Sequence, residues 1–461
     1  MNKHHRKIGM LNVKNMWRLS TRLIFLLFLF AGCEKPNAPV EIDIELDGIE
    51  KYSQTSAALT AIHNLKSKVR SSLATGSPLS LMAEKLDQIA IERSSAIKDA
   101  QSARAELDAL RYQRFPRLLP TAEVSLTGGR ETSIGLSLEQ NIWDGGRLKA
   151  QLHKVNLKVE ESIVRAWRER NEVIYEGLMA YVELSKNSAH LDKLKWLLRD
   201  LKKLQTRLVA RLNGGVSDRG EVLRITTEIQ KTERQIVASR VKLRQEKSKL
   251  QRIHNEFQNL EPIVNLNLAA RSCLRDWPQV EAPDVFLSRI AFERTKALEL
   301  ETRAKRLPRL VLGLGAGHTG SIWTGPVSTF RLDATDMLGL ERNSTIEAAI
   351  SASEAAESAY AEETRDIQIL LEDLDFEYTG LASDAVALRA LIRESEAIVD
   401  LFEKQFEVGS ISLTEGIIFH RELTNTRIAL IDVETRVLMN CLQASKTRGL
   451  LISSGVIDGQ Y

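Results

Sequence analysis

The sequence predicts an α+β membrane protein in which one structural unit occurs twice, each copy being a strand hairpin followed by a long helical hairpin. Two landmarks repeat at nearly the same separation: Pro116 and Pro308 are 192 positions apart, and Gly215 and Gly409 are 194 positions apart. Alternating apolar residues follow each proline, and a long helical pattern precedes each glycine. An internal repeat of this kind indicates units that must pack on neighbours to bury their apolar faces.

The composition supports long helices rather than several compact domains. Ala, Leu, Glu, Lys and Arg dominate, and only 5% of the 461 residues are aromatic. A net charge of +3 gives no reason to infer a nucleic-acid partner. The sequence lacks a glycine-rich phosphate loop, a nucleophile elbow and a Cys/His pattern with metal-ligand spacing. We therefore predict no enzyme activity, no cofactor and no metal site.

Residues 1–32 are predicted to be a signal peptide. A basic stretch precedes an apolar run at 23–30, which is far shorter than the ~20 residues that a membrane-spanning helix needs. The run is followed by Ala-Gly-Cys, which resembles the end of a bacterial lipoprotein signal, so Cys33 is the candidate lipidation site. Phe30 stands where Leu is usual in that signal. An ordinary signal peptide with an incidental cysteine is therefore the alternative.

Residues 33–50 are predicted to be a lipidated, solvated tether. They contain two prolines and six acidic residues. One lipid anchor holds a protein moderately, and the rest of the chain can hold the membrane in other ways. Glu34 follows the cysteine in place of the Asp that retains many lipoproteins at the inner membrane, which favours the outer membrane.

The first structural repeat is predicted to cover 51–258. It starts with helices, continues with a strand hairpin at 117–143, and ends in a helical hairpin whose tip lies near 213–221. The stretch 146–212 contains no proline and predicts one helix on the order of 100 Å long. Beyond the tip, apolar residues recur at every seventh position, namely Val222, Ile229, Ile236, Leu243 and Leu250. This spacing is typical of a coiled coil, so the tip joins two antiparallel helices. An amphipathic helix on a globular core is the alternative.

The second structural repeat is predicted to cover 284–452. It has a helix, a strand hairpin at 309–336 and a helical hairpin whose tip lies near 408–415. Its last helix again has apolar residues at every seventh position. Residues 453–461 are predicted to be a C-terminal tail.

An irregular equatorial segment, 259–283, is predicted between the two repeats, because it contains three prolines. We expect it to pack as a belt around the middle of the helices. Cys273 lies in this segment and Cys441 in the last helix. Because these are different elements, one disulfide and two free thiols both remain open.

Both predicted strand hairpins have one apolar face. Apolar residues alternate with polar ones in the first hairpin and with glycines at the start of the second. Strands of about ten residues with this pattern are typical of an outer-membrane barrel wall, apolar toward lipid and polar toward a wet lumen. A half-polar sheet on a soluble core has the same period, and that alternative remains open.

Four strands cannot close a barrel, and open sheet edges are not tolerated in lipid. If the strands lie in a membrane, several copies must therefore pool them. Three copies provide about twelve strands, enough for a wide barrel with an open lumen. The long helices would then continue the same cylinder.

The order of these elements, with two short stretches, resembles the TolC-like outer-membrane efflux proteins. The stretches are LEQNIWDGGR at 138–147 and FEVGS at 406–410, and the resemblance covers roughly 52–452. It implies a homotrimer with a shared 12-stranded β-barrel, four strands per protomer, continued by a long antiparallel α-helical coiled-coil barrel. One departure is Asp336, which stands where the first copy has Ile142. We expect Asp336 at the periplasmic rim, because a carboxylate facing lipid near mid-depth costs about 2 kcal/mol or more.

The resemblance also implies a function. Such proteins are exit ducts of tripartite efflux or type I secretion systems, and they passively conduct what an inner-membrane pump of the RND or ABC type and a periplasmic adaptor (membrane fusion) protein deliver. The chain is accordingly expected in the bacterial outer membrane, lipid-anchored, with its helices in the periplasm. A lipid-anchored periplasmic scaffold or adaptor without a pore is the alternative, although an adaptor would show compact β-domains. The sequence does not say whether drugs, metals or proteins pass.

The helical tips are where the resemblance places functional residues. In this family the tips constrict the periplasmic entrance, and an acidic ring lies six residues after the tip glycine. That position is Glu415, and its counterpart in the first repeat is Glu221. Three copies of Glu415 near the axis would concentrate cations and filter anions. Alternatively, a Glu in the first turn of a helix simply favours the helix dipole. The family's second acid is absent, since Ile418 and Arg224 occupy its positions.

Other residues near the tips are candidates for gating and for adaptor contact. Arg211 and Arg219 could bridge to acids and hold the entrance shut, with solvated surface charge as the alternative. The tip turns are expected to contact the adaptor. These turns contain Gly214, Gly215, Val408, Gly409 and Ser410.

One charge pattern belongs to this sequence rather than to the family. Residues 191–260 carry 17 Lys/Arg and 8 Asp/Glu, whereas 343–400 carry 3 Arg and 14 Asp/Glu. In a ring where the two halves alternate, opposite fields would fix the order of neighbours, so we expect charge to steer assembly. Two solvated faces whose charges differ by chance are the alternative.

Overall fold

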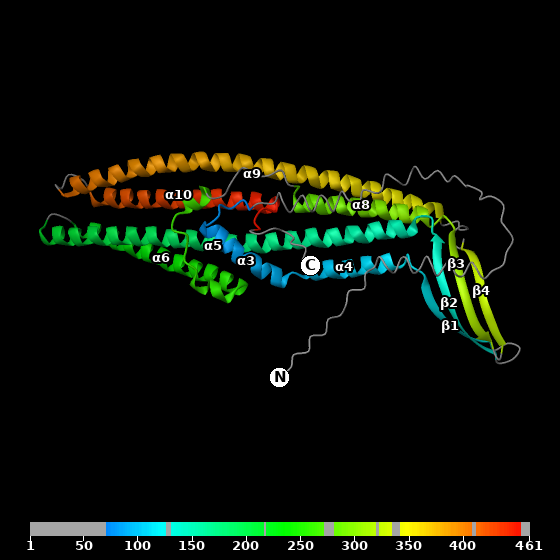
Figure 1. Cartoon of the computed structure of the whole chain (residues 1–461). Helices are drawn as coiled ribbons and strands as arrows, with labels where there is room; N and C mark the ends of the chain where they lie inside the picture. Colours follow the sequence, from blue (N-terminus) through cyan, green and yellow to red (C-terminus); the bar gives the residue numbers. More distant parts are fainter. Residues whose placement is uncertain are drawn as a thin grey trace, which may run out of the picture. The chain divides into compact units, whose positions relative to one another are not determined.

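The computed structural model of the chain describes residues 71–125, 131–215, 218–271, 281–319, 322–333, 342–407 and 412–452 (Figure 1). All of them belong to the second of two compact units, Thr55–Tyr461. Several predicted features lie outside the described residues, namely the signal peptide, Cys33, the tether, Cys273, Asp336 and the tail 453–461.

Two helices, α3 (Pro78–Arg93) and α4 (Ser95–Tyr112), precede the sheet. α3 begins at a capped end: Ser77 Oγ accepts a hydrogen bond from the amide of Ser80 at 3.1 Å, and Pro78 is the first helical residue. Proline suits that position because its missing N–H has no partner there in any case.

The sheet has four antiparallel strands in the order β1-β2-β3-β4, which leaves β1 and β4 as its edges. The strands are β1 (Arg117–Ser125), β2 (Glu131–Trp143), β3 (Arg309–Thr319) and β4 (Ile322–Asp333). The central pair joins the two halves of the chain, with Leu138 opposite Leu314 and Leu136 opposite Ala316.

One face of this sheet exposes large apolar side chains from all four strands. Residues directly opposite in a ladder point to the same face, and the pairs Leu118–Leu138, Leu138–Leu314 and Leu312–Phe330 align their apolar sides. The exposed members are Leu118, Ile134, Leu136, Leu314, Phe330 and Leu332. Large apolar side chains exposed together in this way indicate contact with something other than water.

The Asp-Gly-Gly-Arg sequence at 144–147 makes the turn from β2 into the longest helix. The Asp144 carboxylate accepts hydrogen bonds from the amides of Gly146 and Leu148, at 3.0 and 2.8 Å. Both glycines have positive φ, 67° at Gly145 and 88° at Gly146, a region that L side chains rarely adopt. Arg147 then donates from Nη2 to the carbonyl oxygens of Lys305 and Leu307, just before β3. Through these hydrogen bonds, the turn connects the first structural repeat to the start of β3 in the second.

Two very long helices dominate the fold. They are α5 (Arg147–Asn213), with 67 residues, and α9 (Arg342–Glu407), with 66. Each is about 100 Å long at 1.5 Å per residue. The other helices of this part are α6 (Arg219–Ile253), α7 (Leu266–Arg271), α8 (Pro283–Ala304) and α10 (Leu413–Thr447). Within the described ranges, no helix is both long enough and apolar enough to cross a membrane.

The helices lie side by side in an order that differs from their order in the chain. Toward the tips, α6 packs on α5, α5 on α10 and α10 on α9 (Figure 1). Toward the sheet, α4 packs on α5, α5 on α8 and α8 on α9. The helical layer therefore ends at α9 on one side and at α6 and α4 on the other, just as the sheet ends at β4 and β1.

The predicted seven-residue seam of α6 faces α5. Ile229, Ile236 and Leu250 are buried, and Val222 and Leu243 are half-buried. On the facing helix, Leu194, Leu201 and Leu208 are buried at the same spacing.

The middle of the layer holds the largest apolar core. Trp167 donates its indole N–H to the carbonyl of Gly449 at 3.0 Å, and Tyr181 donates its hydroxyl to the carbonyl of Glu261 at 3.0 Å. Gly177 permits close packing of α3 on α5, because a Cβ there would lie 2.5 Å from Cδ1 of Leu86. Beside it, Arg170 and Asp87 form a two-pronged ion pair at 2.9 Å with both side chains buried.

The segment predicted to be irregular is partly helical. A 3-10 turn, Asn255–Asn259, ends at its first residue, and α7 lies within the segment and packs on α10. The prolines alone did not indicate α7, because none of them falls inside it. Asn267 of α7 donates to the Glu434 carboxylate of α10 at 3.1 Å.

Cys441 of α10 is buried and disulfide-bonded, so two free thiols are excluded. The other two cysteines, Cys33 and Cys273, both lie outside the described residues.

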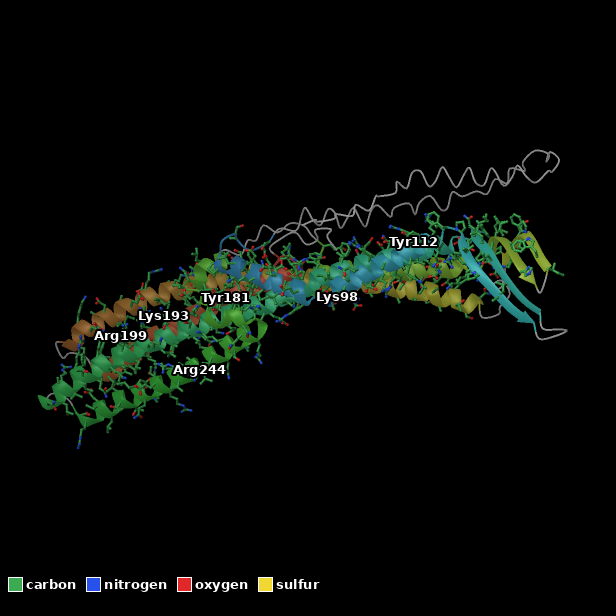
Figure 2. The ribbon with its side chains drawn as sticks, turned by 60° about the horizontal axis from the view of Figure 1, so that its bottom comes forward. Lys98, Tyr112, Tyr181, Lys193, Arg199 and Arg244 are labelled. Atoms are coloured by element: carbon green, nitrogen blue, oxygen red, sulfur yellow. The ribbon has the colours of Figure 1, made fainter. Side chains whose placement is uncertain are left out.

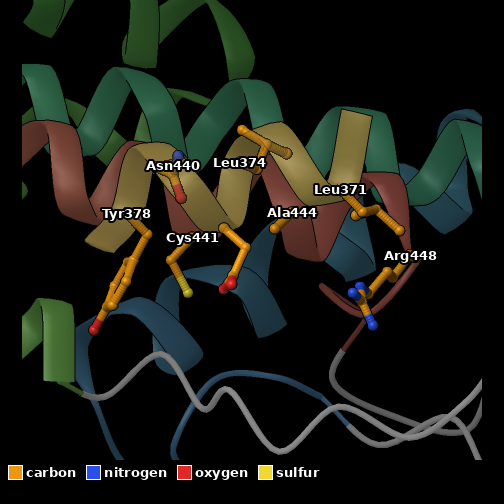
Figure 3. A pocket seen from close by; sticks show the side chains of 8 residues that line it. Leu371, Leu374, Tyr378, Asn440, Cys441, Ala444 and Arg448 are labelled. Carbon is orange, nitrogen blue, oxygen red and sulfur yellow. The ribbon is translucent and has the colours of Figure 1, made fainter. Parts of the chain in front are cut away.

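Cys441 also lines a cavity of about 220 Å³ between α9 and α10, together with Tyr378 and Arg448 (Figure 3). Burial lowers the pKa of Arg448 there.

Candidate functional site

The structure describes most of the first helical tip and, at the second, the end of α9 and the start of α10. α5 ends at Asn213, and Gly214 and the positive-φ Gly215 (74°) lead out of it. α6 then starts at Arg219, and α10 starts at Leu413. Of the residues expected to contact an adaptor, Gly214 and Gly215 are thus in the first turn, whereas Val408, Gly409 and Ser410 lie outside the described residues.

Both glutamates singled out at the tips are the third residue of a capped helix. Asp218 accepts a hydrogen bond from the amide of Glu221 at 2.9 Å, and Ser412 accepts one from the amide of Glu415 at 3.4 Å. An acid in this position stabilises the positive end of the helix dipole. Glu415 is exposed, whereas Glu221 is half-buried. The helix-dipole role therefore applies to both, and only Glu415 also presents its charge fully to solvent.

A shared apolar core holds the four tip helices together. Phe402 and Phe406 of α9 stack with ring centroids 5.5 Å apart, and Gly416 of α10 lies against Phe402. A Cβ on Gly416 would come within 1.9 Å of the Phe402 ring, so only glycine fits. The buried members of this core are Leu197, Leu201, Leu204, Leu208, Ile225, Ile229, Phe402, Phe406, Leu413 and Ile417.

A polar contact also links the two hairpins at their tips. Arg224 Nη1 of α6 donates to Thr414 Oγ1 of α10 at 3.0 Å, and Arg421 of α10 lies 3.8 Å from the Glu228 carboxylate of α6. Neither contact has a signal in the sequence, because the partners are about 190 residues apart. Arg224 occupies the position where the resemblance to the TolC-like proteins implies a second acid. Its hydrogen bond to Thr414 connects the two hairpins.

The two arginines that could bridge to acids have different surroundings within one protomer, and their bridging role stays a prediction. Arg211 places its guanidinium 4.6 Å from the centroid of the Phe406 ring, a cation–π contact with the end of α9. Planar guanidinium groups stack readily on aromatic faces, which favours this partner over a solvated carboxylate. Arg219 is exposed and makes no ion pair with the part of the chain that the structure describes.

No known protein-family model matches the sequence, and no curated protein does. Solved structures do match. The outer membrane protein VceC of Vibrio cholerae matches with a TM-score of 0.65 at 13% identity, over 81% of this chain and 97% of that one. The CmeC outer membrane channel of Campylobacter jejuni matches with a TM-score of 0.64 at 14% identity, over 93% and 95% of the two chains.

The MtrE outer membrane channel of Neisseria gonorrhoeae, in its open state, matches with a TM-score of 0.66 at 16% identity, over 81% of this chain and 90% of that one. Identities this low establish a likeness of fold, and the coverage extends it to nearly the whole of each solved chain. The chain therefore has the protomer fold of these outer-membrane channels, which agrees with its resemblance to the TolC-like proteins.

Proposed function

We propose that this chain is one protomer of a homotrimeric outer-membrane channel, the exit duct of a tripartite efflux or type I secretion system. The observation that carries the proposal is that both layers of the protomer end in open edges. The sheet ends at β1 and β4, and the helical layer ends at α4 and α6 on one side and α9 on the other.

Open edges of this kind can be closed by a ring of identical copies. Each copy offers one edge to its neighbour and accepts the other, which is a head-to-tail contact that closes when the rotation returns to the start. β4 of one copy then meets β1 of the next, and three copies supply about twelve strands. The helical edges meet in the same way, so the cylinder continues beyond the sheet.

The two faces of the sheet support a position in a membrane. Its apolar face exposes leucine, isoleucine and phenylalanine side chains, as lipid contact requires. The opposite face carries Ser137 and Glu139, opposite Gly315 and Gly313, and suits a wet lumen. In the trimer, apolar side chains lie against lipid and every strand edge is paired.

The tips supply the periplasmic entrance in this proposal. The exposed carboxylates of Glu415 ring the entrance, and the turns at Gly214, Gly215 and 408–410 contact a periplasmic adaptor. An inner-membrane pump delivers the substrate, and the channel conducts it passively. A lipid on Cys33 holds each protomer to the outer membrane.

The proposal is tested by fractionation and by conductance. The full chain, expressed with its leader, should be found in outer membranes as a trimer that dissociates only on heating in detergent. Reconstituted in planar bilayers, that trimer should carry discrete current steps. A monomer in the soluble periplasmic fraction, or a trimer without current, would show that the protein is a scaffold or adaptor and not a duct.

A further inference from the structure

The two helices at the edges of the helical layer near the tips, α6 and α9, carry net charges of opposite sign. α6 contains ten Lys/Arg and four Asp/Glu. The tip-proximal part of α9, residues 373–407, contains three Lys/Arg and nine Asp/Glu. Surfaces of opposite sign attract one another and disfavour contact between two copies of the same surface.

α6 has a second stripe of residues, on the side away from its buried seam. Its members follow one another at alternating steps of four and three, the spacing of a helix-packing face, and all are exposed. They are Leu223, Thr227, Gln230, Arg234, Val237, Val241, Arg244 and Ser248. Figure 2 shows Arg244 on α6 at the edge of the helical layer. We call this set the α6 outer stripe.

α9 has a similar exposed stripe away from α10. Its residues also follow one another at steps of three and four. They are Phe376, Gly380, Asp384, Ala387, Leu391, Glu394, Ile398 and Leu401. We call this set the α9 outer stripe. Apolar side chains lie in both stripes, but the charged members are arginines on α6 and carboxylates on α9.

Contacts of α10 with both edge helices show which residues of α6 and α9 lie at the same distance from the tip. We call two such residues level with each other. Arg421 of α10 approaches Glu228 of α6, and His420 of α10 meets the ring of Phe402 of α9 with centroids 6.2 Å apart. Glu228 therefore lies level with about Phe402. α6 runs away from the tip and α9 runs toward it, so residue numbers rise on α6 as they fall on α9.

With this alignment, the arginines of the α6 outer stripe lie at nearly the same distance from the tip as the carboxylates of the α9 outer stripe. Arg234 lies level with about residue 396 and Arg244 with about residue 386. Along the helix axis, Arg234 is therefore within two residues of Glu394, and Arg244 is within two residues of Asp384. Two residues correspond to ~3 Å of helix rise. The arginines are ten residues apart and so are the two carboxylates. None of the four forms an ion pair with any residue in the described ranges.

We propose that the α6 outer stripe of one copy packs on the α9 outer stripe of the next, with Arg234 paired to Glu394 and Arg244 to Asp384. The inference rests on the proposed trimer and identifies the contact that sets its register. A cyclic ring is generated by rotation without translation, so residues that are level within one copy remain level between neighbours. The apolar members bury one another, and the paired charges exclude contacts between two α6 or two α9 stripes.

The test compares charge reversal with charge exchange in the full-length protein, extracted from membranes and measured by light scattering. R234E/R244E and D384R/E394R each place like charges opposite one another. Each double variant should lower the trimer fraction at least tenfold at low salt, and high salt should reduce the defect. The quadruple variant, which exchanges the charges, should restore the trimer.

A control pair carries the same charge changes off the stripes. Arg240 of α6 and Glu403 of α9 are exposed and belong to neither stripe. R240E and E403R should therefore leave the trimer fraction unchanged. Circular dichroism should show the same helix content in every variant, which separates assembly from folding.

Cross-linking supplies a second measurement that does not depend on stability. R234C/E394C treated with a short thiol-to-thiol reagent should give dimers and trimers in denaturing gels, and R240C/E403C should give monomers. If the double reversals remain fully trimeric, the quadruple variant stays monomeric, or the cross-link fails, the stripes do not meet. A wild-type trimer that carries current would in that case leave the proposed channel function intact. A wild-type monomer would overturn both proposals.

Discussion

Arg147 and Leu307 are 160 positions apart in the chain, yet Nη2 of Arg147 donates a hydrogen bond of 3.0 Å to the carbonyl oxygen of Leu307. The contact lies where the sheet meets the helices. Beside it, a Cβ on Gly145 would lie 2.6 Å from Cβ of Leu307. The turn at 144–147 is thus held by a hydrogen bond and by close packing against the same residue.

Replacing Gly145 by Ala should destabilise the protein more than the same change at Gly215. Both glycines have positive φ, 67° and 74°, and alanine costs about 1 kcal/mol in that region at either position. No other described residue lies within 4 Å of a Cβ at Gly215, whereas at Gly145 the added methyl also forces Leu307 to move. Such overpacking costs about 1–3 kcal/mol more. Denaturant unfolding followed by helical circular dichroism measures both, and equal losses would contradict the close packing.

The free energy of unfolding should fall as pH rises from about 4.5 to about 7 because of Glu160. Burial, together with the neighbouring Glu293 and against the opposing charge of Arg289, raises the pKa of this α5 carboxyl to about 7. A raised pKa means that the folded state holds the proton more tightly than the unfolded state. The contribution is complete below about pH 4.5 and is lost by pH 7–8, a change of up to about 3 kcal/mol.

The Glu160→Gln variant keeps the oxygen that accepts the hydrogen bond from Asn156, at 3.2 Å in the native protein. It should match the wild type near pH 4 and exceed it at pH 8, as measured by melting temperature across this range. Parallel pH profiles of the two proteins would show that Glu160 is not the responsible group.

Neutralising the tip glutamates should change ion selectivity to different degrees. Glu415 is exposed at the start of α10, whereas Glu221 is half-buried at the equivalent place in α6. Glu415→Gln should therefore lower the cation-to-anion permeability ratio of the reconstituted channel by about twofold or more, and Glu221→Gln by less. Reversal potentials in a salt gradient provide the measurement. Glu84→Gln, an exposed change on α3, is the control for the loss of one charge.

Cys441 should be bonded to Cys273. α7 packs on α10, which contains Cys441, and α7 ends at Arg271, two positions before Cys273. A lipid on Cys33 would consume the only other thiol. Mass spectrometry of unreduced peptides should find 273 linked to 441, and reduction should release them. A peptide joining Cys441 to Cys33 would exclude both this pairing and the lipid anchor.

The local elements were predictable because their signals are local. Alternation marked the strands, the seven-residue spacing marked the seam at Ile229 and Ile236, and Gly214 and Gly215 marked the turn between α5 and α6. Dipeptides and short periods of this kind act through neighbouring backbone, so they remain readable without a structure.

The tertiary structure alone decided which distant segments touch. The fold brings the Phe406 ring beside Arg211, and Gly416 is required only because Phe402 packs there. The order α6-α5-α10-α9 likewise depends on contacts across the two halves of the chain. No short-range spacing encodes such contacts, because their free energy comes from burying surfaces that meet only after the chain has folded.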